Sequence, residues 1–235
     1  MIVPVFVSNN IEHSKHDLVN AVFYLVETGC QIRLLPNDFL SYTAVWSFYR
    51  RAVKSGKWEK TMDLLVKRTR KDAGHKPTPI CGLIDSQSAK TTLASDDRGF
   101  DGLKKIKGRK RHIVVDTMGN ALAISVLAAN IRDTKSGINL AKKAFETYPT
   151  IQRFCGDNGY RKSFEEVVLE QLGLGVDISK RIKPEFEVLP KRWLVERTFS
   201  WGNNSHRLSK DYEIKIIHEE NMFMISHLPT QLRRY

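Results

Sequence analysis

Hydrophobic positions in the first third of the chain recur at the spacing of amphipathic helices. Apolar residues between 18 and 26 follow this spacing and stop before Gly29, and residues 45–53 repeat it before Ser55-Gly56. A third such stretch runs from about 58 to 71. Because residues three and four apart share one face of a helix, these patterns predict three helices that each bury one face.

The pattern changes after residues 74–79, where one glycine and two prolines interrupt regular structure. Short apolar and β-branched runs then predict five strands, at 80–84, 111–117, 121–128, 151–155 and 176–179. Residues 116–120 are turn formers between the second and third of these runs. The second and third strands are therefore predicted to form a hairpin.

Helices are predicted between and after the later strands. One begins at Asp133, an expected N-cap, one spans 163–172, and a helical region begins near Pro190. The order β-β-β-α-β-α-β-α is typical of an α/β fold with a mixed five-stranded sheet and flanking helices. We therefore expect a small helical region over 1–74, preceding a larger α/β domain over 75–235.

Charge and composition narrow the functional classes. The 235 residues carry 38 Lys+Arg against 26 Asp+Glu, a formal net charge of +12, which favours a polyanionic partner such as nucleic acid. The three cysteines include no CxxC pair, which argues against a disulfide framework or a cysteine zinc site. No apolar run reaches the length of a membrane span and the first residues lack signal-peptide features, so we expect a cytoplasmic protein.

Three carboxylates lie where a reactive site is expected. Asp85 lies inside the first predicted strand, bounded by Ile84 and Ser86, where a carboxylate is costly unless it is paired or binds a metal. Asp157 follows the fourth predicted strand, the neighbour of the first in this topology, and Glu196 lies on the last helical region. Such a trio suits divalent cations that clamp a phosphoryl group. The alternative is that each acid is structural, with Asp157 in a turn and Glu196 in an ion pair with Arg192 or Arg197.

Basic side chains gather just before the second predicted strand. Six of the eight residues from 104 to 111 are basic: Lys104, Lys105, Lys107, Arg109, Lys110 and Arg111. A basic loop at the mouth of a carboxylate site would bind the DNA backbone by counterion release, whereas the alternative is a solvated loop. Lys90 is a further candidate phosphate contact. The basic run 67–71 is open to the same two interpretations, since cations also suit a helix C-terminus.

Four motifs occur together in one order: DSQSAKTT at 85–92, GRKRHIVVDT at 108–117, GDNGY at 156–160 and RWLVERTFSW at 192–201. Together they resemble the DDE transposases of bacterial insertion sequences, specifically the insertion-sequence-five group, which is related to the insertion-sequence-four superfamily. The resemblance covers nearly the whole chain.

This resemblance implies an RNase H-like catalytic domain whose triad is Asp85, Asp157 and Glu196. These side chains would hold Mg²⁺ or Mn²⁺, as two ions. The implied reaction is nicking at the 3′ ends of the element followed by strand transfer into target DNA. The implied partners are the terminal inverted repeats and the target DNA, bound by a homodimer at the bacterial nucleoid.

Related transposases carry a Tyr-x2-Arg-x3-Glu-x6-Lys signature around the glutamate. Here Arg192 and Glu196 match it, while Leu189 and Asn203 stand at the tyrosine and lysine positions. On a helix, Arg192, Glu196, Asn203 and Arg207 would share one polar stripe facing DNA. Arg197 is a further expected DNA contact. Two alternatives to an active transposase are a catalytically silent DNA-binding remnant and an RNase H-like DNA nuclease.

Overall fold

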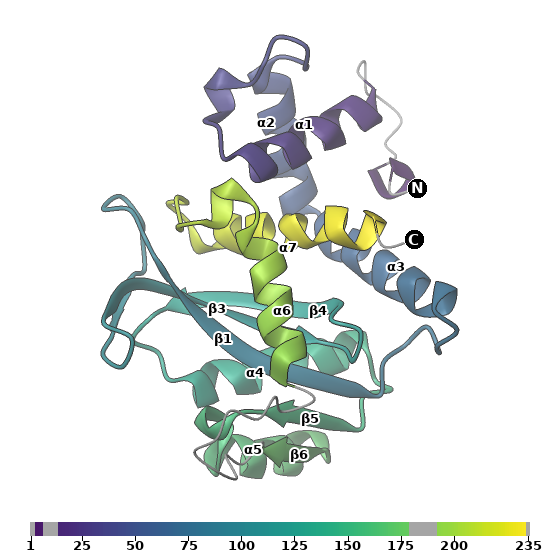
Figure 1. Cartoon of the computed structure of the whole chain (residues 1–235), viewed down its shortest axis with the longest axis vertical. Coiled ribbons are helices and arrows are strands. Elements are labelled where there is room, and N and C mark those ends of the chain that lie inside the picture. The colour runs from purple at the N-terminus through teal and green to yellow at the C-terminus, as the bar shows by residue number, and fades with distance from the viewer. Residues whose placement is uncertain (1–2, 7–13, 179–191, 234–235) are drawn as a thin grey trace.

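The computed structural model describes residues 3–6, 14–178 and 192–233. Its centre is a six-stranded mixed sheet (Figure 1). The strands are β1 (Cys81–Lys90), β2 (Gly99–Asp101), β3 (Ile106–Val115), β4 (Ala121–Ala128), β5 (Arg153–Gly156) and β6 (Gly175–Ile178). β1 is central: it pairs antiparallel with β3 and parallel with β5. β3 also pairs with β4, and β5 with β6, which is the strand order of the RNase H-like sheet that the resemblance implied.

The sheet differs from the sequence-based expectation in its second strand. β3 begins at Ile106 rather than at Arg111, and the additional strand β2 pairs with its first residues. The predicted basic loop is therefore largely a strand. Gly108 permits the close pairing of β3 with β1, because a Cβ atom at this position would lie 2.0 Å from the backbone oxygen of Ala89 on β1.

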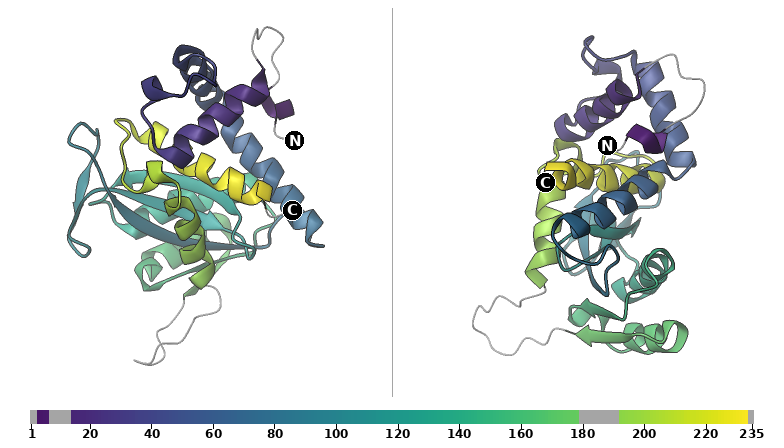
Figure 2. Two further views of the ribbon diagram at one scale, coloured as in Figure 1. Left: turned by 45° about the horizontal axis from the view of Figure 1, so that its top comes forward. Right: turned by 90° about the vertical axis from the view of Figure 1, so that its right-hand side faces the viewer.

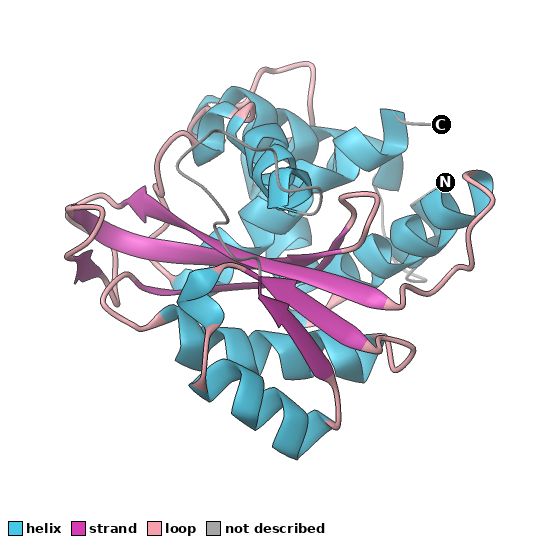
Figure 3. Cartoon of the chain, turned by 60° about the horizontal axis from the view of Figure 1, so that its bottom comes forward, coloured by secondary structure: helices cyan, strands magenta, loops and turns pink. Residues whose placement is uncertain are grey.

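Helices cover both faces of the sheet (Figure 3). α4 (Asp133–Thr147) and α5 (Ser163–Leu172) pack on one face, where Val114 and Phe154 join their apolar side chains. α6 (Arg192–Asn203) and α7 (Ile216–Arg233) cover the other, against Leu83 and Ile113. Short 3₁₀ turns complete the described elements: η1 (Val3–Phe6), η2 (Ile32–Leu34), η3 (Asn158–Tyr160) and η4 (His206–Leu208).

The N-terminal helices have the expected extents: α1 (Lys15–Thr28), α2 (Tyr42–Lys54) and α3 (Lys57–Asp72). Gly29 ends α1 in the left-handed conformation with φ of 69°, as its position after the apolar pattern predicted. α7 lies between the sheet and the helices α1 and α2, whereas α3 packs beside α7 and also contacts β4 (Figures 1 and 2). A single hydrophobic cluster therefore joins α1, α2 and α3 to α6, α7 and the sheet.

The basic end of α3 is mostly committed to ion pairs. Arg70 donates to Asp116 in the β3–β4 turn over 2.7 Å, with both side chains buried. Lys67 and Arg68 pair with acids one turn away on α3 itself. Arg70 thus anchors α3 to the sheet domain across the 74–79 linker.

None of the helices in the described ranges is long and apolar enough to cross a bilayer.

Candidate active site

Asp85 and Asp157 lie at the same level of two neighbouring parallel strands. Leu83 on β1 is in register with Cys155 on β5. Asp85 and Asp157 are each two residues further along, so the register brings their backbones side by side at the carboxyl end of β5. The expectation that the first strand and the strand before Asp157 are neighbours is confirmed.

The sheet face of Asp85 follows from the alternation of strand residues. Leu83 belongs to the hydrophobic cluster that includes Leu194 and Val195 of α6. Because side chains two apart on a strand point to the same face, Asp85 faces α6 as well. Glu196 is the next residue on α6 and is exposed. The helix that carries the third carboxylate therefore covers the face of the sheet that carries the first.

Backbone amides hold both aspartates at their strands. The Ser86 amide donates to Asp85 Oδ1 over 2.7 Å, and the Gly159 amide donates to Asp157 Oδ1 over 2.9 Å. The second bond is the turn interaction considered as an alternative role for Asp157. It uses one carboxylate oxygen and leaves the other, so the turn role and a ligand role are compatible.

A polar network lies behind Asp85, on the α4 face. Ser86 donates from Oγ to Asp133 Oδ1 over 3.1 Å, and Lys110 Nζ lies 3.1 Å from the same oxygen. Lys110 also reaches Asp101 at 3.8 Å, and Ser88 donates to Asp101 over 2.7 Å. These contacts join β1, which carries Asp85, to the start of α4 and to β2.

This network corrects the role expected for Asp133. The N-cap of α4 is Arg132, without a side-chain cap, and Asp133 lies in the first turn. Its carboxylate is directed to Ser86 and Lys110 instead of to its own helix amides. Sequence reasoning missed this role because a helix-start aspartate is usually explained by capping.

The pKa of the Tyr160 hydroxyl reflects burial and the charges of three aspartates. Burial raises its pKa well above the usual value, and the charges of Asp85, Asp133 and Asp157 raise it further. The ring is 1% exposed and packs edge-on against Phe164. The Tyr160 phenol is therefore buried and neutral near the candidate metal ligands.

The candidate ligands are carboxylates, the type of ligand that a hard divalent cation prefers, but they do not surround a position for an ion. Asp85 and Asp157 supply carboxylates from adjacent strand positions, and carboxylate oxygen is the ligand that Mg²⁺ and Mn²⁺ prefer. Within the described residues, no three His, Cys, Asp or Glu side chains gather closely enough to hold an ion. The side chain of Arg192 and the signature position Leu189 lie outside the described part of the chain.

Two tryptophans anchor the helix that carries Glu196. The Arg197 guanidinium lies 4.4 Å from the ring centroid of Trp193 and 4.5 Å from that of Trp201. Arg197 also donates to the Met118 carbonyl over 3.1 Å, at the β3–β4 turn. This side chain thus joins α6 to the hairpin, and its expected contact with DNA stays a prediction.

The basic cluster before the second predicted strand divides into buried and exposed members. Arg109 is fully buried, donates to Asp211 over 3.0 Å and also bonds the carbonyls of Asp96, Glu213 and Ile214. Arg111 is 1% exposed and donates to Glu219 over 2.5 Å. Lys110 is buried in the network described above. Arg109 and Arg111 point to the sheet face that α7 covers and Lys110 points to the α4 face, so each of the three cations is buried beside an acidic partner.

The other candidate DNA contacts also divide by exposure. Arg207 donates to Glu213 over 2.6 Å and to the Cys30 carbonyl over 3.1 Å, so its guanidinium has a structural role, while its expected contact with DNA stays a prediction. The candidates that remain on the surface are Lys90, Lys104, Lys105, Lys107 and Asn203. Lys90 ends β1 and Asn203 ends α6. Lys104, Lys105 and Lys107 lie at or just before the start of β3.

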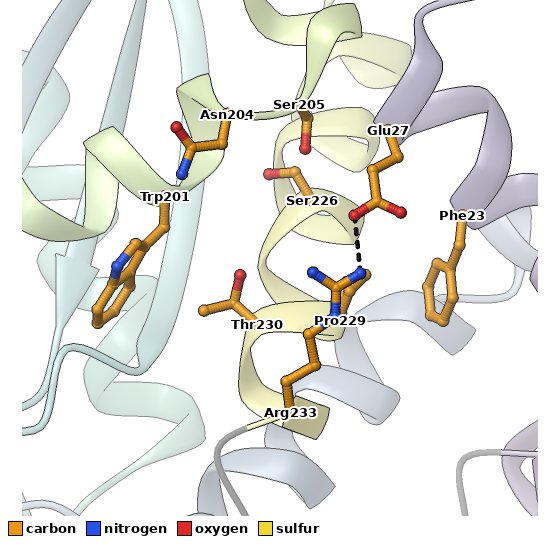
Figure 4. A pocket seen from close by; sticks show the side chains of 9 residues that line it. All are labelled: Phe23, Glu27, Trp201, Asn204, Ser205, Ser226, Pro229, Thr230 and Arg233. Carbon is orange, nitrogen blue, oxygen red and sulfur yellow. Dashed lines mark hydrogen bonds and ion pairs between the residues drawn. The ribbon is translucent and has the colours of Figure 1, made fainter.

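A small hollow of about 90 Å³ lies between α1, α6 and α7 (Figure 4). Glu27 and Arg233 form an ion pair of 2.9 Å across it. The pair joins α1 to the end of α7 and, at this volume, leaves room for little more than water.

The class of protein to which this α/β domain belongs is shown by comparison with protein families. Residues 76–228 match the transposase DDE domain family, and residues 4–62 match the family described as putative transposase of the IS4/5 family. The first match spans more than half of the chain. The chain therefore belongs to the transposase DDE domain family, as the resemblance implied.

One curated relative is the putative transposase for insertion sequence element IS402 from Burkholderia cepacia. It is 30% identical over 118 residues, which is 45% of this chain and 54% of the relative. The match spans about half the length of that relative. Among solved structures, the catalytic core of BIV integrase is 10% identical, covering 63% of this chain and 82% of the other, with a TM-score of 0.40. The Mos1 transposase paired-end complex is 14% identical, covering 97% and 80%, with a TM-score of 0.29.

Proposed function

We propose that this chain is a DNA transposase that nicks the 3′ ends of an insertion sequence and joins them to target DNA, with Asp85, Asp157 and Glu196 as its catalytic carboxylates. The observation that carries the proposal is the register of β1 and β5, which sets Asp85, in the middle of β1, beside Asp157, directly after the end of β5. Membership of the transposase family supports it.

In this proposal Asp85 and Asp157 hold two Mg²⁺ or Mn²⁺ ions between them, and Glu196 completes one of the two sites. When bound, these ions supply the charge that stabilises the attacking and leaving oxygens of an in-line phosphoryl displacement. The same carboxylates serve nicking and strand transfer, because both steps displace an oxygen at a DNA phosphate.

The protein contributes position and charge. The Ser86 and Gly159 amides restrain the two aspartates, so that little reorganisation is needed when a phosphate arrives. The stacked Arg197 fixes α6, and with it Glu196, against the β3–β4 turn. The exposed Lys104, Lys105 and Lys107 attract the phosphate backbone. Joining of two element ends requires two active sites, which we assign to a homodimer on DNA.

The test uses the purified chain and a duplex carrying the repeats that flank its own reading frame. With Mg²⁺ or Mn²⁺, wild-type protein should release 3′-hydroxyl nicks at the repeat end, and Asp157→Asn should lower the rate by at least about a thousandfold. Asp177→Asn is the matched control, because Asp177 lies on the next strand, is half exposed and pairs with Arg153. Equal activity of Asp157→Asn and wild type would contradict the proposal. DNA binding without nicks would favour the DNA-binding remnant, and nicks without joined products would favour the nuclease.

A further inference from the structure

Two cysteine thiols face one another on neighbouring strands, just before the candidate catalytic carboxylates. The sulfur atoms of Cys81, on β1, and Cys155, on β5, are 3.6 Å apart, and the side chains are 8% and 4% exposed. Cys155 also donates to Asp177 Oδ2 on β6 over 3.8 Å. Because the Cys155 proton is directed to Asp177, a lone pair of its sulfur faces Cys81. The two thiols are therefore placed to react with one another.

The sheet places this thiol pair on the same face as the carboxylates. Cys81 is four residues before Asp85, and Cys155 is two residues before Asp157. Because side chains alternate along a strand, each thiol points to the same face as the carboxylate that follows it. Both thiols belong to the hydrophobic cluster that contains Val195 of α6, the helix that carries the third carboxylate. A change at the thiol pair is thus transmitted directly to the candidate active site.

The register shows that the two cysteines are diagonal to one another. Cys81 is opposite Arg153, and Leu83 is opposite Cys155, so the cysteines are offset by two residues. Strand spacing and rise then place their Cα atoms about 8 Å apart. A disulfide usually holds its Cα atoms about 4.4–6.8 Å apart and its sulfur atoms about 2.0 Å apart. Closing the bond therefore requires the two strands to shift by roughly 1–2 Å.

β5 is the strand that can shift. It runs only from Arg153 to Gly156, and its other neighbour is β6 at the edge of the sheet. β1 runs from Cys81 to Lys90 and is paired with β3 over most of that length. Drawing Cys155 toward Cys81 pulls β5 back along β1. Asp157 then moves with β5, away from its position beside Asp85.

We propose that Cys81 and Cys155 form an oxidisable thiol pair, whose disulfide reversibly disables the candidate active site by displacing Asp157 from Asp85. Formation of the disulfide does not depend on the proposed function, whereas its effect on DNA nicking rests on it. A misplacement of about 1 Å can cost a hundredfold in rate, so the oxidised chain should nick DNA about a hundredfold more slowly. It should also bind Mn²⁺ at least about tenfold more weakly.

The oxidant is a peroxide. The sulfur of one cysteine attacks an oxygen of hydrogen peroxide, the O–O bond breaks, and the released hydroxide leaves as water with the thiol proton. The second sulfur attacks the resulting sulfenic acid, the S–O bond breaks as the S–S bond forms, and a second water leaves with the second thiol proton. The two sulfur atoms thus lose two electrons, which reduce the peroxide to water. Hydrogen peroxide is little larger than water, and Cys81 begins β1 next to the exposed Ile80.

The experiment treats the purified full chain with hydrogen peroxide and then removes the oxidant by desalting. Remaining thiols are alkylated and the chain is digested with trypsin for mass spectrometry. Peptides 72–90 and 154–161, which carry Cys81 and Cys155, should be joined until dithiothreitol separates them. Mn²⁺ binding is followed by the paramagnetic resonance of the free ion, and nicking is measured with Mg²⁺ on the repeat duplex. Both should fall on oxidation and recover with dithiothreitol.

Three alanine variants test whether the pair is responsible. Cys81→Ala and Cys155→Ala should each keep, after peroxide, the Mn²⁺ affinity that they have before it, because one thiol cannot close the bond. Circular dichroism shows whether each variant folds, and either one is sufficient if the other does not. Cys30→Ala is the matched control, because Cys30 follows α1 in the N-terminal region. This variant should remain as sensitive to peroxide as wild type.

The outcomes separate this proposal from the proposed function. The proposal is overturned if the two peptides stay separate, if peroxide yields only a sulfinic acid that dithiothreitol cannot reverse, or if joined peptides leave Mn²⁺ affinity unchanged. Joined peptides with weakened Mn²⁺ binding would support it even if the reduced chain forms no nicks, in which case only the proposed catalysis fails. Absence of Mn²⁺ binding by the reduced chain would overturn both.

Discussion

Ser86, the residue directly after Asp85, donates a hydrogen bond from its hydroxyl to Asp133 Oδ1 over 3.1 Å, while its amide donates to Asp85 Oδ1 over 2.7 Å. One residue therefore links a candidate catalytic carboxylate on the α6 face to a carboxylate on the α4 face. Lys110 bonds the same Asp133 oxygen from β3. Asp133 therefore fixes the backbone that carries Asp85, although Asp133 lies on the opposite face of the sheet.

Ser86→Ala is expected to slow DNA nicking about tenfold while leaving the fold intact. The loss of one neutral-to-charged hydrogen bond costs about 1.5–3 kcal/mol at most, which a domain of this size tolerates. The less restrained Asp85 would bind metal less well, so the Mg²⁺ concentration for half-maximal nicking should also rise. A metal titration of the nicking rate measures both effects.

Ser136→Ala is the matched control for that substitution. Ser136 is buried on α4, and its hydroxyl bonds only the Arg132 carbonyl of the same helix turn. This variant should lose similar stability yet keep the wild-type metal dependence. If the two serine variants show the same metal dependence, Asp133 does not position Asp85.

Arg109→Met is expected to lower the free energy of unfolding by about 3–5 kcal/mol, because it leaves Asp211 buried without its cation. Urea unfolding followed by circular dichroism measures this loss. Replacing both partners, as Arg109→Met with Asp211→Leu, should recover a large part of it, since no uncompensated charge then remains buried. If Arg109 were instead a surface contact to phosphate, the single variant would keep its stability and lose DNA affinity.

Much of the fold follows from hydrophobic spacing, because spacing reports which faces are buried. The three N-terminal helices, the hairpin of β3 and β4 and the helix over 163–172 appear where apolar residues recur. The basic start of β3 was misread because Arg109 and Arg111 alternate like buried strand residues but carry charge. Their partners, Asp211 and Glu219, lie about a hundred residues later, and no local pattern connects such positions.

The carboxylate pair could be predicted for a different reason. Topology alone makes the strand before Asp157 a neighbour of the strand with Asp85, and the register then sets the two side by side. The supporting residues could not be predicted in the same way. Asp133 and Ser86 meet only through the packing of α4 under the sheet, which depends on side-chain volumes rather than on a repeat.

Lys105→Ala and Lys107→Ala are each expected to reduce the salt dependence of DNA binding, because both side chains are exposed and lack acidic partners in the described structure. Loss of one phosphate contact lowers the slope of log Kd against log salt by about 0.9. Lys142→Ala removes one charge from the other face and should leave the slope unchanged. Fluorescence anisotropy over a range of salt concentrations measures all three, and an unchanged slope for both Lys105→Ala and Lys107→Ala would place the DNA elsewhere.

His112 makes the folded chain sensitive to acid. Its ring is fully buried on β3, and neither ring nitrogen has a hydrogen-bond partner in the described structure. Burial lowers its pKa from 6.5 to about 4, against the opposing charge of Asp133, while Lys110 and Lys104 lower it further. Between these two values the unfolded chain binds a proton that the folded chain does not, so stability falls as the pH falls from about 6.5 to 4.

The contribution of His112 can be isolated by His112→Leu, which removes the titration but keeps an apolar side chain of similar size. A pKa difference of this magnitude corresponds to about 3 kcal/mol lost by wild type over that pH range. Urea midpoints measured at several pH values should therefore decline less steeply for the variant than for wild type as the pH falls from 6.5 to about 4. His75→Gln, at an exposed position after α3, should follow the wild-type curve. Parallel curves for wild type and His112→Leu would show that His112 is protonated equally in the folded and unfolded chains.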